Sequence, residues 1–313
     1  MNEKKILTEK DLSSYNFGQG MTVKDVNINT IAEFNGDESV VAIAGSRAMA
    51  IKCADMKFPS LKLFQLTSAG FDGVPCEKYA EKNIAVTNAG SVYSVPIAET
   101  VVFGILQMAK KIRKNPNNRH FNILRGYDRF ITEVDSKKVL IMGAGNIGTA
   151  VADRLSGFGM EIDGYDPYCA DKPRYKKMLR TREDLKKSLP DYDYIVSTMP
   201  DNEETQKFIN KELFDCMKDT AVIVNVGRKA VFDNEDFYVA LKSGKIGGAV
   251  LDMFEKIPNP LTNKFRRLKN VVILPGVAAI SKEVNGRLRE HMAKNILASI
   301  KGETLTNVIN GVK

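Results

Sequence analysis

The clearest chemical pattern in the sequence is the glycine-rich segment 143–148, Gly-Ala-Gly-Asn-Ile-Gly, directly after the apolar run Val139–Met142. Glycines at these three positions permit a tight turn, a close approach of the backbone to a phosphate, and tight packing of a following helix. The unpaired N–H groups at the start of that helix, expected from Ile147 to about Leu155, also favour an anion. The segment therefore predicts binding of a dinucleotide pyrophosphate by Gly143, Gly145, Asn146, Ile147 and Gly148.

An acidic residue follows at the distance that such a site requires. Asp166 ends the next apolar run, 18 residues beyond Gly148. A carboxylate there can accept hydrogen bonds from both hydroxyls of the adenosine ribose, and it would repel a 2′-phosphate. We therefore expect NAD as the cofactor in preference to NADP, although Lys172 and Arg174 lie close enough in sequence to weaken that preference.

Short β-branched runs alternate with helical stretches from Val139 to Leu274, which predicts a parallel sheet covered by helices on both faces. Thr181 is expected to cap one helix, and Asp233 another that runs to Ser243 and stops at Gly244. The expected strands are Val139–Met142, Glu161–Tyr165, Tyr194–Ser197, Ala221–Asn225, Gly248–Leu251 and Val271–Leu274.

A second, smaller α/β pattern precedes this region, with expected strands at Val40–Ala44, Lys62–Thr67 and Ile84–Thr87. A long apolar helix is expected from about Pro96 to Lys111, and an amphipathic helix after Ser281 to about Ile300. The predicted fold class is α/β with two doubly wound parallel-sheet domains. A Rossmann NAD-binding domain, residues 96–282, is inserted into a flavodoxin-like domain formed by residues 1–95 and 283–313.

Composition sets broad limits on the function. The chain has 313 residues, 43% of them hydrophobic and 27% charged, which is typical of soluble proteins with two ordinary domains. We found no apolar run approaching a membrane span and no secretory signal. The four cysteines form no CxxC pair, so we expect no disulfide framework and no metal site. These features favour a cytoplasmic protein without a membrane partner.

The formal net charge of +8 raises the question of nucleic-acid binding. Basic residues are densest at 172–187 and again at 110–114, but neither stretch carries a nucleic-acid-binding motif. We expect a solvated surface face with no nucleic-acid partner. Attraction of an anionic substrate by this face and binding of nucleic acid through residues 172–187 remain the alternatives.

From about Ser68 to Asn310 the sequence resembles the D-isomer-specific 2-hydroxyacid dehydrogenases. Several of this family's markers occur in family order around the glycine-rich segment. They are Thr67–Gly70, Val86–Ala89, Ala98-Glu99, Met199-Pro200 with Thr205, Val224–Arg228, Gly247–Asp252 and Asn270–Pro275.

The resemblance implies specific roles for several residues. Arg228 stands where the family has the arginine that binds the substrate carboxylate and polarises the 2-oxo group. Asp252 matches the aspartate that hydrogen-bonds the nicotinamide carboxamide. The backbone of Ser68, Ala69 and Gly70 would hold the substrate carboxylate. Tyr93 falls on a loop that lines the substrate in the family, and it would either contact the substrate there or have an ordinary packing role. Further cofactor contacts are expected from Met199, Pro200, Thr205, Val226, Gly227 and Gly276. A small 2-hydroxy or 2-oxo acid substrate and a homodimer formed largely through the cofactor domain are also implied.

The sequence departs from the family at two catalytic positions. With Asp252 and Pro258 fixing the register, Ile257 stands at the glutamate position and Gly276 at the histidine position. The chain has only two histidines, His120 and His291, and neither is expected to take over the role. Lys229, which replaces a family glycine, is a further candidate proton donor but is more typical of an exposed lysine.

General acid–base catalysis typically contributes about 10²–10⁴-fold, so its loss slows turnover without abolishing it. We expect an NAD-dependent oxidoreductase acting on CH–OH that is slow or uses an altered proton route. The alternative is an NAD(H)-binding sensor or partner module that has lost catalysis. The first is favoured because Arg228, Asp252 and the substrate-loop pattern are retained.

Overall fold

The computed structural model describes residues 3–111, 131–252 and 264–312. The chain forms two compact units: unit 1 contains Met1–Tyr93 and Ile280–Lys313, and unit 2 contains Ser94–Ala279. These limits lie within three residues of the limits expected from the sequence. Each unit has its own parallel sheet, and the two sheets are described separately below.

Unit 1 contains a five-stranded sheet in the order β2-β1-β3-β4-β5, with every neighbouring pair parallel. The last three strands were expected, within one residue at each end. The first two were not: β1 is short, and β2 is a half-exposed edge strand, so neither shows a long apolar run. The strands are β1 (Lys4–Thr8), β2 (Met21–Asp25), β3 (Val40–Gly45), β4 (Leu63–Leu66) and β5 (Ala85–Thr87).

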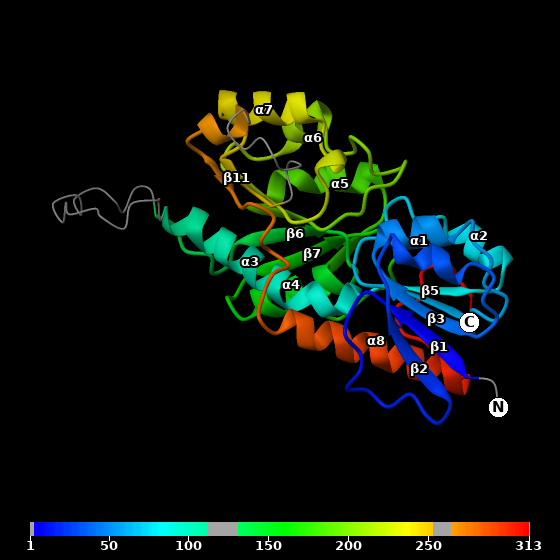
Figure 1. The fold of residues 1–313 in the computed structure, drawn as a ribbon. Coiled ribbons are helices and arrows are strands. Elements are labelled where there is room, and N and C mark those ends of the chain that lie inside the picture. The colour runs from blue at the N-terminus through cyan, green and yellow to red at the C-terminus, as the bar shows by residue number, and fades with distance from the viewer. Residues whose placement is uncertain (1–2, 112–130, 253–263, 313) are drawn as a thin grey trace. The chain divides into compact units, whose positions relative to one another are not determined.

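Helices cover both faces of this sheet, as Figure 1 shows. On one face α1 (Arg47–Cys53) and α2 (Cys76–Glu81) bury apolar side chains against alternate strand residues such as Ile43 and Phe64. On the other, α8 (Val284–Lys301) packs Leu288, Met292 and Ile296 against the opposite strand residues. A 3-10 helix, η1 (Thr30–Phe34), adds Ile31 to the first face.

Unit 2 contains a seven-stranded sheet in the order β12-β11-β10-β9-β6-β7-β8, again with every neighbouring pair parallel. Six strands agree with the expected ranges within one residue. The short edge strand β8 was missed because it lies within the basic stretch. The strands are β6 (Lys138–Met142), β7 (Glu161–Tyr165), β8 (Lys177–Leu179), β9 (Tyr194–Ser197), β10 (Val222–Asn225), β11 (Gly248–Leu251) and β12 (Val271–Ile273).

The helices of unit 2 also lie on both faces of their sheet (Figure 1). One face carries α5 (Arg182–Ser188), α6 (Lys211–Cys216) and α7 (Asn234–Ser243), whose apolar residues share one core with alternate strand residues. The opposite face carries α4 (Asn146–Ser156), which contacts β6 and β7. The described residues of this unit also form the 3-10 helices η4 (Leu189–Asp191), η5 (Lys229–Val231) and η6 (Lys264–Arg267).

The caps expected from the sequence are confirmed. The Thr181 side chain accepts a hydrogen bond from the Asp184 N–H at the start of α5, and Asp233 accepts from two N–H groups at the start of α7. The helix α7 ends at Gly244, whose φ of +76° is the left-handed conformation that glycine adopts most readily.

The long apolar helix α3 (Gly90–Lys110) begins six residues earlier than expected, and the boundary between the units falls within it. Pro96, the expected first residue of this helix, lies inside it. By length and composition α3 could cross a bilayer, contrary to the expectation that no such segment exists. However, 56% of its most apolar window is buried within this fold, as in the core helix of a soluble protein.

Candidate functional site

The predicted cofactor residues of unit 2 lie along one edge of its sheet, because all seven strands are parallel and their carboxyl ends meet there. From β7 to β11 this edge carries in order Asp166, the glycine-rich loop, Met199-Pro200, Arg228 and Asp252. Four strand intervals of about 4.8 Å span about 19 Å, which gives room for an extended dinucleotide. The chain adds β7 and β8 on one side of β6 and then β9 to β12 on the other side. Such a topological switch point is where α/β sheets bind ligands.

The glycine-rich loop has the geometry that its sequence predicts. Gly143 has a φ of +95°, and a Cβ there would lie 2.8 Å from the Thr198 hydroxyl oxygen. A Cβ on Gly148 would overlap the Gly143 carbonyl oxygen, so only glycine lets α4 approach β6 this closely. A Cβ on Gly145 would instead meet nothing within 4 Å. The second glycine therefore faces open space, where a phosphate could approach the backbone.

Asp166 is tied to the backbone around it. Its Oδ2 accepts from the Ala144 N–H at 2.9 Å, and its Oδ1 accepts from the Tyr168 and Cys169 N–H groups, both at 3.0 Å. The carboxylate thus fixes the glycine-rich loop against the loop after β7. It stands at the β7 end of the row, the position for which the sequence predicts a ribose-binding residue.

A cleft of about 390 Å³ opens beside these residues within unit 2. Aromatic side chains form much of its wall, and the Tyr165 and Phe208 rings lie 5.6 Å apart. The Tyr168 hydroxyl donates to Glu204, which links two of its walls. The cleft is lined by Gly143, Gly145, Tyr165–Cys169, Met199, Pro200, Asn202, Glu204, Thr205 and Phe208. Its size and apolar character suit an adenine ring beside its ribose.

Thr205 holds one side of this cleft in place. Its hydroxyl donates to the Pro200 carbonyl oxygen at 2.8 Å, and its N–H donates to the Asn202 side chain at 3.0 Å. Thr205 therefore shapes the segment after β9. This hydrogen bond to Pro200 gives a structural reason for the occurrence of Thr205 together with Met199-Pro200 in the expected cofactor pattern.

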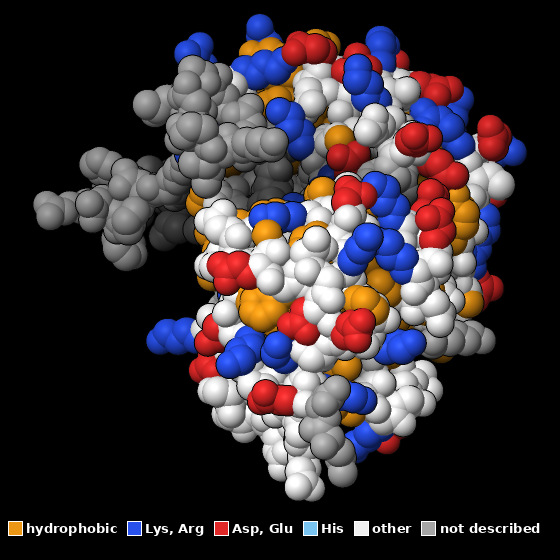
Figure 2. All heavy atoms as spheres, turned by 45° about the vertical axis from the view of Figure 1, so that its right-hand side comes forward, with side chains coloured by type: hydrophobic (Ala, Val, Ile, Leu, Met, Phe, Trp, Pro, Cys, Tyr) orange, Lys and Arg blue, Asp and Glu red, His pale blue; other side chains and the backbone are white. Residues whose placement is uncertain are grey.

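Most side chains of the basic stretch 172–187 are exposed or half-buried, as expected for a solvated face, but several of its basic groups have specific partners. Arg174 pairs with Asp153 at 2.6 Å, so it is committed to α4. Lys172 donates to the Ala144 carbonyl oxygen at 2.6 Å, and the Arg182 guanidinium lies 4.7 Å from the Phe208 ring centre. On the face shown in Figure 2, basic and acidic side chains are intermixed. This distribution gives no continuous basic surface on that face.

Arg228 follows β10 and precedes η5. The buried Asn225 shapes this turn: its Oδ1 accepts from the Gly227 N–H at 3.1 Å. Gly227 is required here because a Cβ would lie 2.7 Å from the Met199 carbonyl oxygen. The Asn-x-x-Arg spacing thus places the half-buried Arg228 at the carboxyl edge of the sheet, two residues after Val226.

Asp252 follows β11 and is only 3% exposed. Its Oδ1 accepts from the Val277 N–H at 2.9 Å, which joins it to the segment after β12. Gly276 lies in that segment with a φ of +69°. A residue with a side chain at 276 would therefore be strained, so glycine suits the backbone found here.

In unit 1 the predicted substrate loop follows β4. The Ser68 hydroxyl donates to the Gly70 carbonyl oxygen at 2.7 Å, and the Asn88 side-chain amide donates to the Ala69 carbonyl oxygen at 2.8 Å. The backbone N–H groups of Ser68, Ala69 and Gly70 make no hydrogen bond with other described residues. Three successive N–H donors on a braced loop are well suited to a carboxylate.

Tyr93 lies on α3, and the expectation that it belongs to a loop is wrong. Its hydroxyl donates to the Thr67 carbonyl oxygen at 2.5 Å, and burial raises its pKa. Helix formation extends to Gly90 because Asn88 accepts the Gly90 N–H at 3.1 Å and so organises the first turn. Tyr93 therefore anchors α3 to the residue that precedes the substrate loop.

His291 is half-buried on α8, where its Nε2 lies 2.9 Å from the Asn88 carbonyl oxygen. Burial lowers the pKa of its imidazole. Sequence reasoning missed Asn88, which contacts both His291 and the substrate loop. Its position could have indicated a role, because Asn88 directly follows a parallel strand and therefore lies at the carboxyl edge of the sheet, where α/β proteins bind ligands.

Other candidate residues fall outside the described part of the chain. These are Ile257 at the glutamate position, with Pro258, and the second histidine, His120. Among the described residues, no group of three or more His, Cys, Asp and Glu side chains is placed to hold a metal ion.

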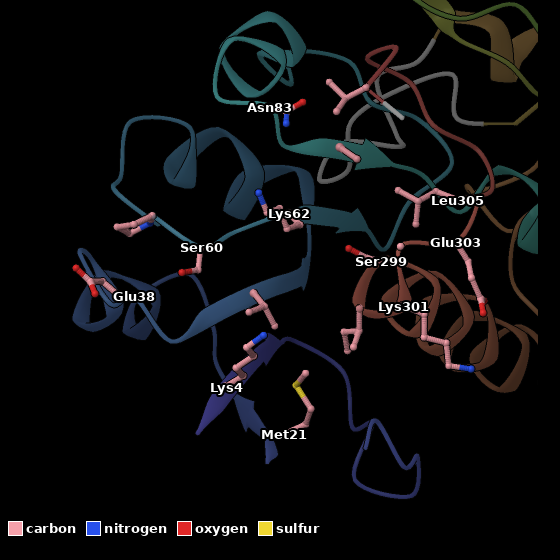
Figure 3. Close-up of a pocket in the computed structure, with 16 residues that line it drawn as sticks. Lys4, Met21, Glu38, Ser60, Lys62, Asn83, Ser299, Lys301, Glu303 and Leu305 are labelled. Atoms are coloured by element: carbon pink, nitrogen blue, oxygen red, sulfur yellow. The ribbon is translucent and has the colours of Figure 1, made fainter. Parts of the chain in front are cut away.

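A cavity of about 780 Å³ lies elsewhere in unit 1, where Figure 3 shows it. Lys4 and Lys62 stand at the amino ends of their strands on its wall, with Ser299 and Leu305 at the end of α8. The substrate loop follows the carboxyl end of β4, at the opposite edge of the same sheet. The cavity is therefore separate from the predicted substrate-binding residues.

The fold and the edge residues define unit 2 as a dinucleotide-binding domain of the doubly wound type. Residues 102–278 match the family model described as D-isomer specific 2-hydroxyacid dehydrogenase, NAD binding domain. The chain belongs to the D-isomer-specific 2-hydroxyacid dehydrogenase family.

Named relatives agree with this assignment. A glyoxylate reductase of Korarchaeum cryptofilum is 32% identical over 262 residues, covering 80% of this chain and 77% of that protein. A D-3-phosphoglycerate dehydrogenase of Methanocaldococcus jannaschii is also 32% identical, over 81% of this chain and 48% of that protein.

The fold is shared with solved structures at lower identity. D-mandelate dehydrogenase of Rhodotorula graminis is 20% identical, with a TM-score of 0.84 over 100% of this chain and 99% of that one. An NADPH-dependent glyoxylate/hydroxypyruvate reductase of Sinorhizobium meliloti, in complex with NADP and malonate, is 22% identical, with a TM-score of 0.74 over 99% of this chain and 98% of that one.

Proposed function

We propose that this chain is an NAD-dependent oxidoreductase that moves a hydride between NAD(H) and a small 2-hydroxy or 2-oxo acid. The observation that carries the proposal is the position of Arg228 between Met199 and Asp252 along the cofactor edge of unit 2. A guanidinium at the nicotinamide end of that row can bind a substrate carboxylate and a 2-oxo group together.

The residues present fit NAD. The open space at Gly145 and the start of α4 would accept the pyrophosphate, Asp166 the ribose, and the 390 Å³ cleft the adenine. Asp252 would accept a hydrogen bond from the nicotinamide carboxamide. When bound, the nicotinamide supplies the carbon that gives or receives the hydride. Among relatives, one reductase is named as NADPH-dependent, so our preference for NAD in this chain depends on the Asp166 carboxylate.

Unit 1 would supply the rest of the substrate contacts, and we propose it as the substrate domain. The N–H groups of Ser68, Ala69 and Gly70 would donate to the substrate carboxylate. By its resemblance to the family, the chain has Gly276 and Ile257 at the positions of the acid–base pair, and the φ of +69° at Gly276 is one that glycine adopts readily. We propose that a water molecule supplies the proton, which makes turnover slow.

The test is NADH oxidation with a panel of 2-oxo acids that includes glyoxylate and hydroxypyruvate. Arg228→Ala should lower kcat/KM about 10²–10³-fold, as for removal of a group that stabilises developing oxyanion charge. Arg289→Ala, an exposed arginine on α8, is the matched control and should leave kcat/KM unchanged. A kcat/KM that Arg228→Ala leaves unchanged would contradict the proposal.

The second candidate is an NAD(H)-responsive binding protein without turnover. The replacement of both acid–base positions favours it, while the retained Arg228 does not. It predicts NADH binding with no oxidation of NADH by any panel member. We also propose that the protein is a cytoplasmic homodimer, as family resemblance implies.

A further inference from the structure

The backbone of Ala144, in the middle of the glycine-rich loop, forms hydrogen bonds with side chains through both its N–H and its carbonyl group. Its N–H donates to Asp166 Oδ2 at 2.9 Å, and its carbonyl oxygen accepts from Lys172 Nζ at 2.6 Å. Lys172 Nζ also lies 2.9 Å from the Thr149 hydroxyl oxygen, and that hydroxyl lies 3.3 Å from the same carbonyl. Ala144 itself is fully buried. The loop is therefore fixed between an anionic and a cationic side chain.

The ammonium group of Lys172 differs from the basic groups of its neighbours in the partners that it contacts. Arg174 pairs with Asp153, Lys176 with Glu161 and Arg180 with Asp171. Both hydrogen-bond partners of the Lys172 ammonium are neutral oxygens, and no carboxylate within the described ranges lies within 4.0 Å of it. Its positive charge is thus not neutralised by an adjacent carboxylate.

Lys172 places its positive charge beside the amino-terminal turn of α4. Thr149 lies in the first turn of α4, where the helix dipole is positive and favours anions over cations. A half-buried ammonium there is unfavourable until an anion joins it. The pyrophosphate of a dinucleotide would bind at the same helix terminus, beside Gly145. The Lys172 ammonium group would then attract the phosphates, and this attraction would outweigh its repulsion from the positive end of the helix dipole.

We propose that Lys172 is a positioning residue for the dinucleotide: it holds the Ala144 carbonyl and places positive charge beside the phosphates. This rests on the cofactor half of the proposed function, not on turnover. Charge near the phosphates strengthens binding of NAD(H) while contributing little to the stability of the cofactor-free protein. Sequence reasoning placed this lysine among surface residues because its contact with the loop spans 28 residues of chain.

The test compares Lys172→Met, which keeps the stem and removes the charge, with Lys172→Arg and the control Lys176→Met. The probe is NADH, and binding is measured by calorimetry at several salt concentrations. We expect Lys172→Met to raise the Kd for NADH about 10-fold, the loss typical for a hydrogen bond to a charged group, and to flatten its dependence on salt. Lys172→Arg should retain most of the affinity, and Lys176→Met all of it.

Thermal unfolding without cofactor separates this role from a merely structural one. The Tm of cofactor-free Lys172→Met should equal or exceed that of the wild type. An unchanged Kd would overturn the proposal, and so would a loss of affinity that is independent of salt and accompanied by a lower Tm. Wild-type protein that fails to bind NADH would instead refute the proposed function itself.

Discussion

At the scale of single residues, the candidate site depends on side chains that hold backbone in place. Asn225 fixes the turn before Arg228, Thr205 shapes the segment after Pro200, and Asp166 secures the glycine-rich loop. Asn88 does the same for the substrate loop of unit 1. The groups expected to touch cofactor or substrate are thus held by neighbours that satisfy backbone N–H and carbonyl groups.

We expect Asn88→Ala to raise KM for the 2-oxo acid about 10-fold with a smaller change in kcat. Its amide group braces the Ala69 carbonyl oxygen, and loss of one hydrogen bond to a binding loop typically costs about 1 kcal/mol or somewhat more. Steady-state kinetics at saturating NADH measure the effect. Asn16→Ala, in an exposed turn of the same unit, serves as the control. A fall in kcat at constant KM would contradict a role in substrate binding.

At the scale of elements, α8 is joined to the sheet of unit 1 by a buried polar network. Asn295, 1% exposed, donates to the Gln65 side-chain oxygen at 2.7 Å, which also accepts from the Thr87 hydroxyl at 2.7 Å. The Asn295 oxygen accepts from the N–H and the hydroxyl of Thr306. This network links β4, β5, α8 and the C-terminal tail around one amide side chain.

Asn295→Leu should lower the free energy of unfolding by about 1–3 kcal/mol, because it removes these hydrogen bonds and leaves buried polar groups with fewer partners. Urea unfolding followed by circular dichroism measures the change. Lys294→Ala, on the exposed side of the same helix, should change it by no more than about 0.5 kcal/mol. If both variants unfold at the same urea concentration as the wild type, the network is not important for stability.

At the scale of the whole molecule, the folding equilibrium responds to the protonation of His291. Burial holds the pKa of the folded-state imidazole below its usual value of 6.5. As pH falls below about 6.5, the unfolded chain takes up a proton that the folded protein resists, so stability decreases. The stabilising contribution is complete above the unfolded pKa and is lost as pH falls through the folded pKa.

We therefore expect the Tm difference between wild type and His291→Gln to be larger at pH 7.5 than at pH 5.5. Glutamine keeps a donor for the Asn88 carbonyl oxygen but does not titrate. Differential scanning calorimetry of both proteins between pH 5.5 and pH 7.5 measures this Tm difference. A Tm difference that is independent of pH would show that His291 is equally protonated in both states.

The sequence by itself determined the class of fold and most of the cofactor edge. Alternating apolar runs and helix caps are local signals, so six strands of unit 2, the start of α5 and both ends of α7 could be predicted from them. A Cβ would collide with backbone at Gly148 and Gly227 and with the Thr198 hydroxyl at Gly143, and that constraint is visible in the sequence as an ordered motif. The resemblance to the family adds the other residues expected along this edge of the sheet, from Asp166 to Asp252.

The tertiary structure alone decided which residues support those motifs. Lys172 reaches Ala144 across 28 residues, and His291 reaches Asn88 across 203. Neither pairing follows from local periodicity, because each depends on how separate elements pack. The same holds for β1 and β2, which become strands through pairing with β3 and with each other rather than through their own apolar content. Local chemistry thus fixes where a site can form, while packing selects the side chains that hold it in shape.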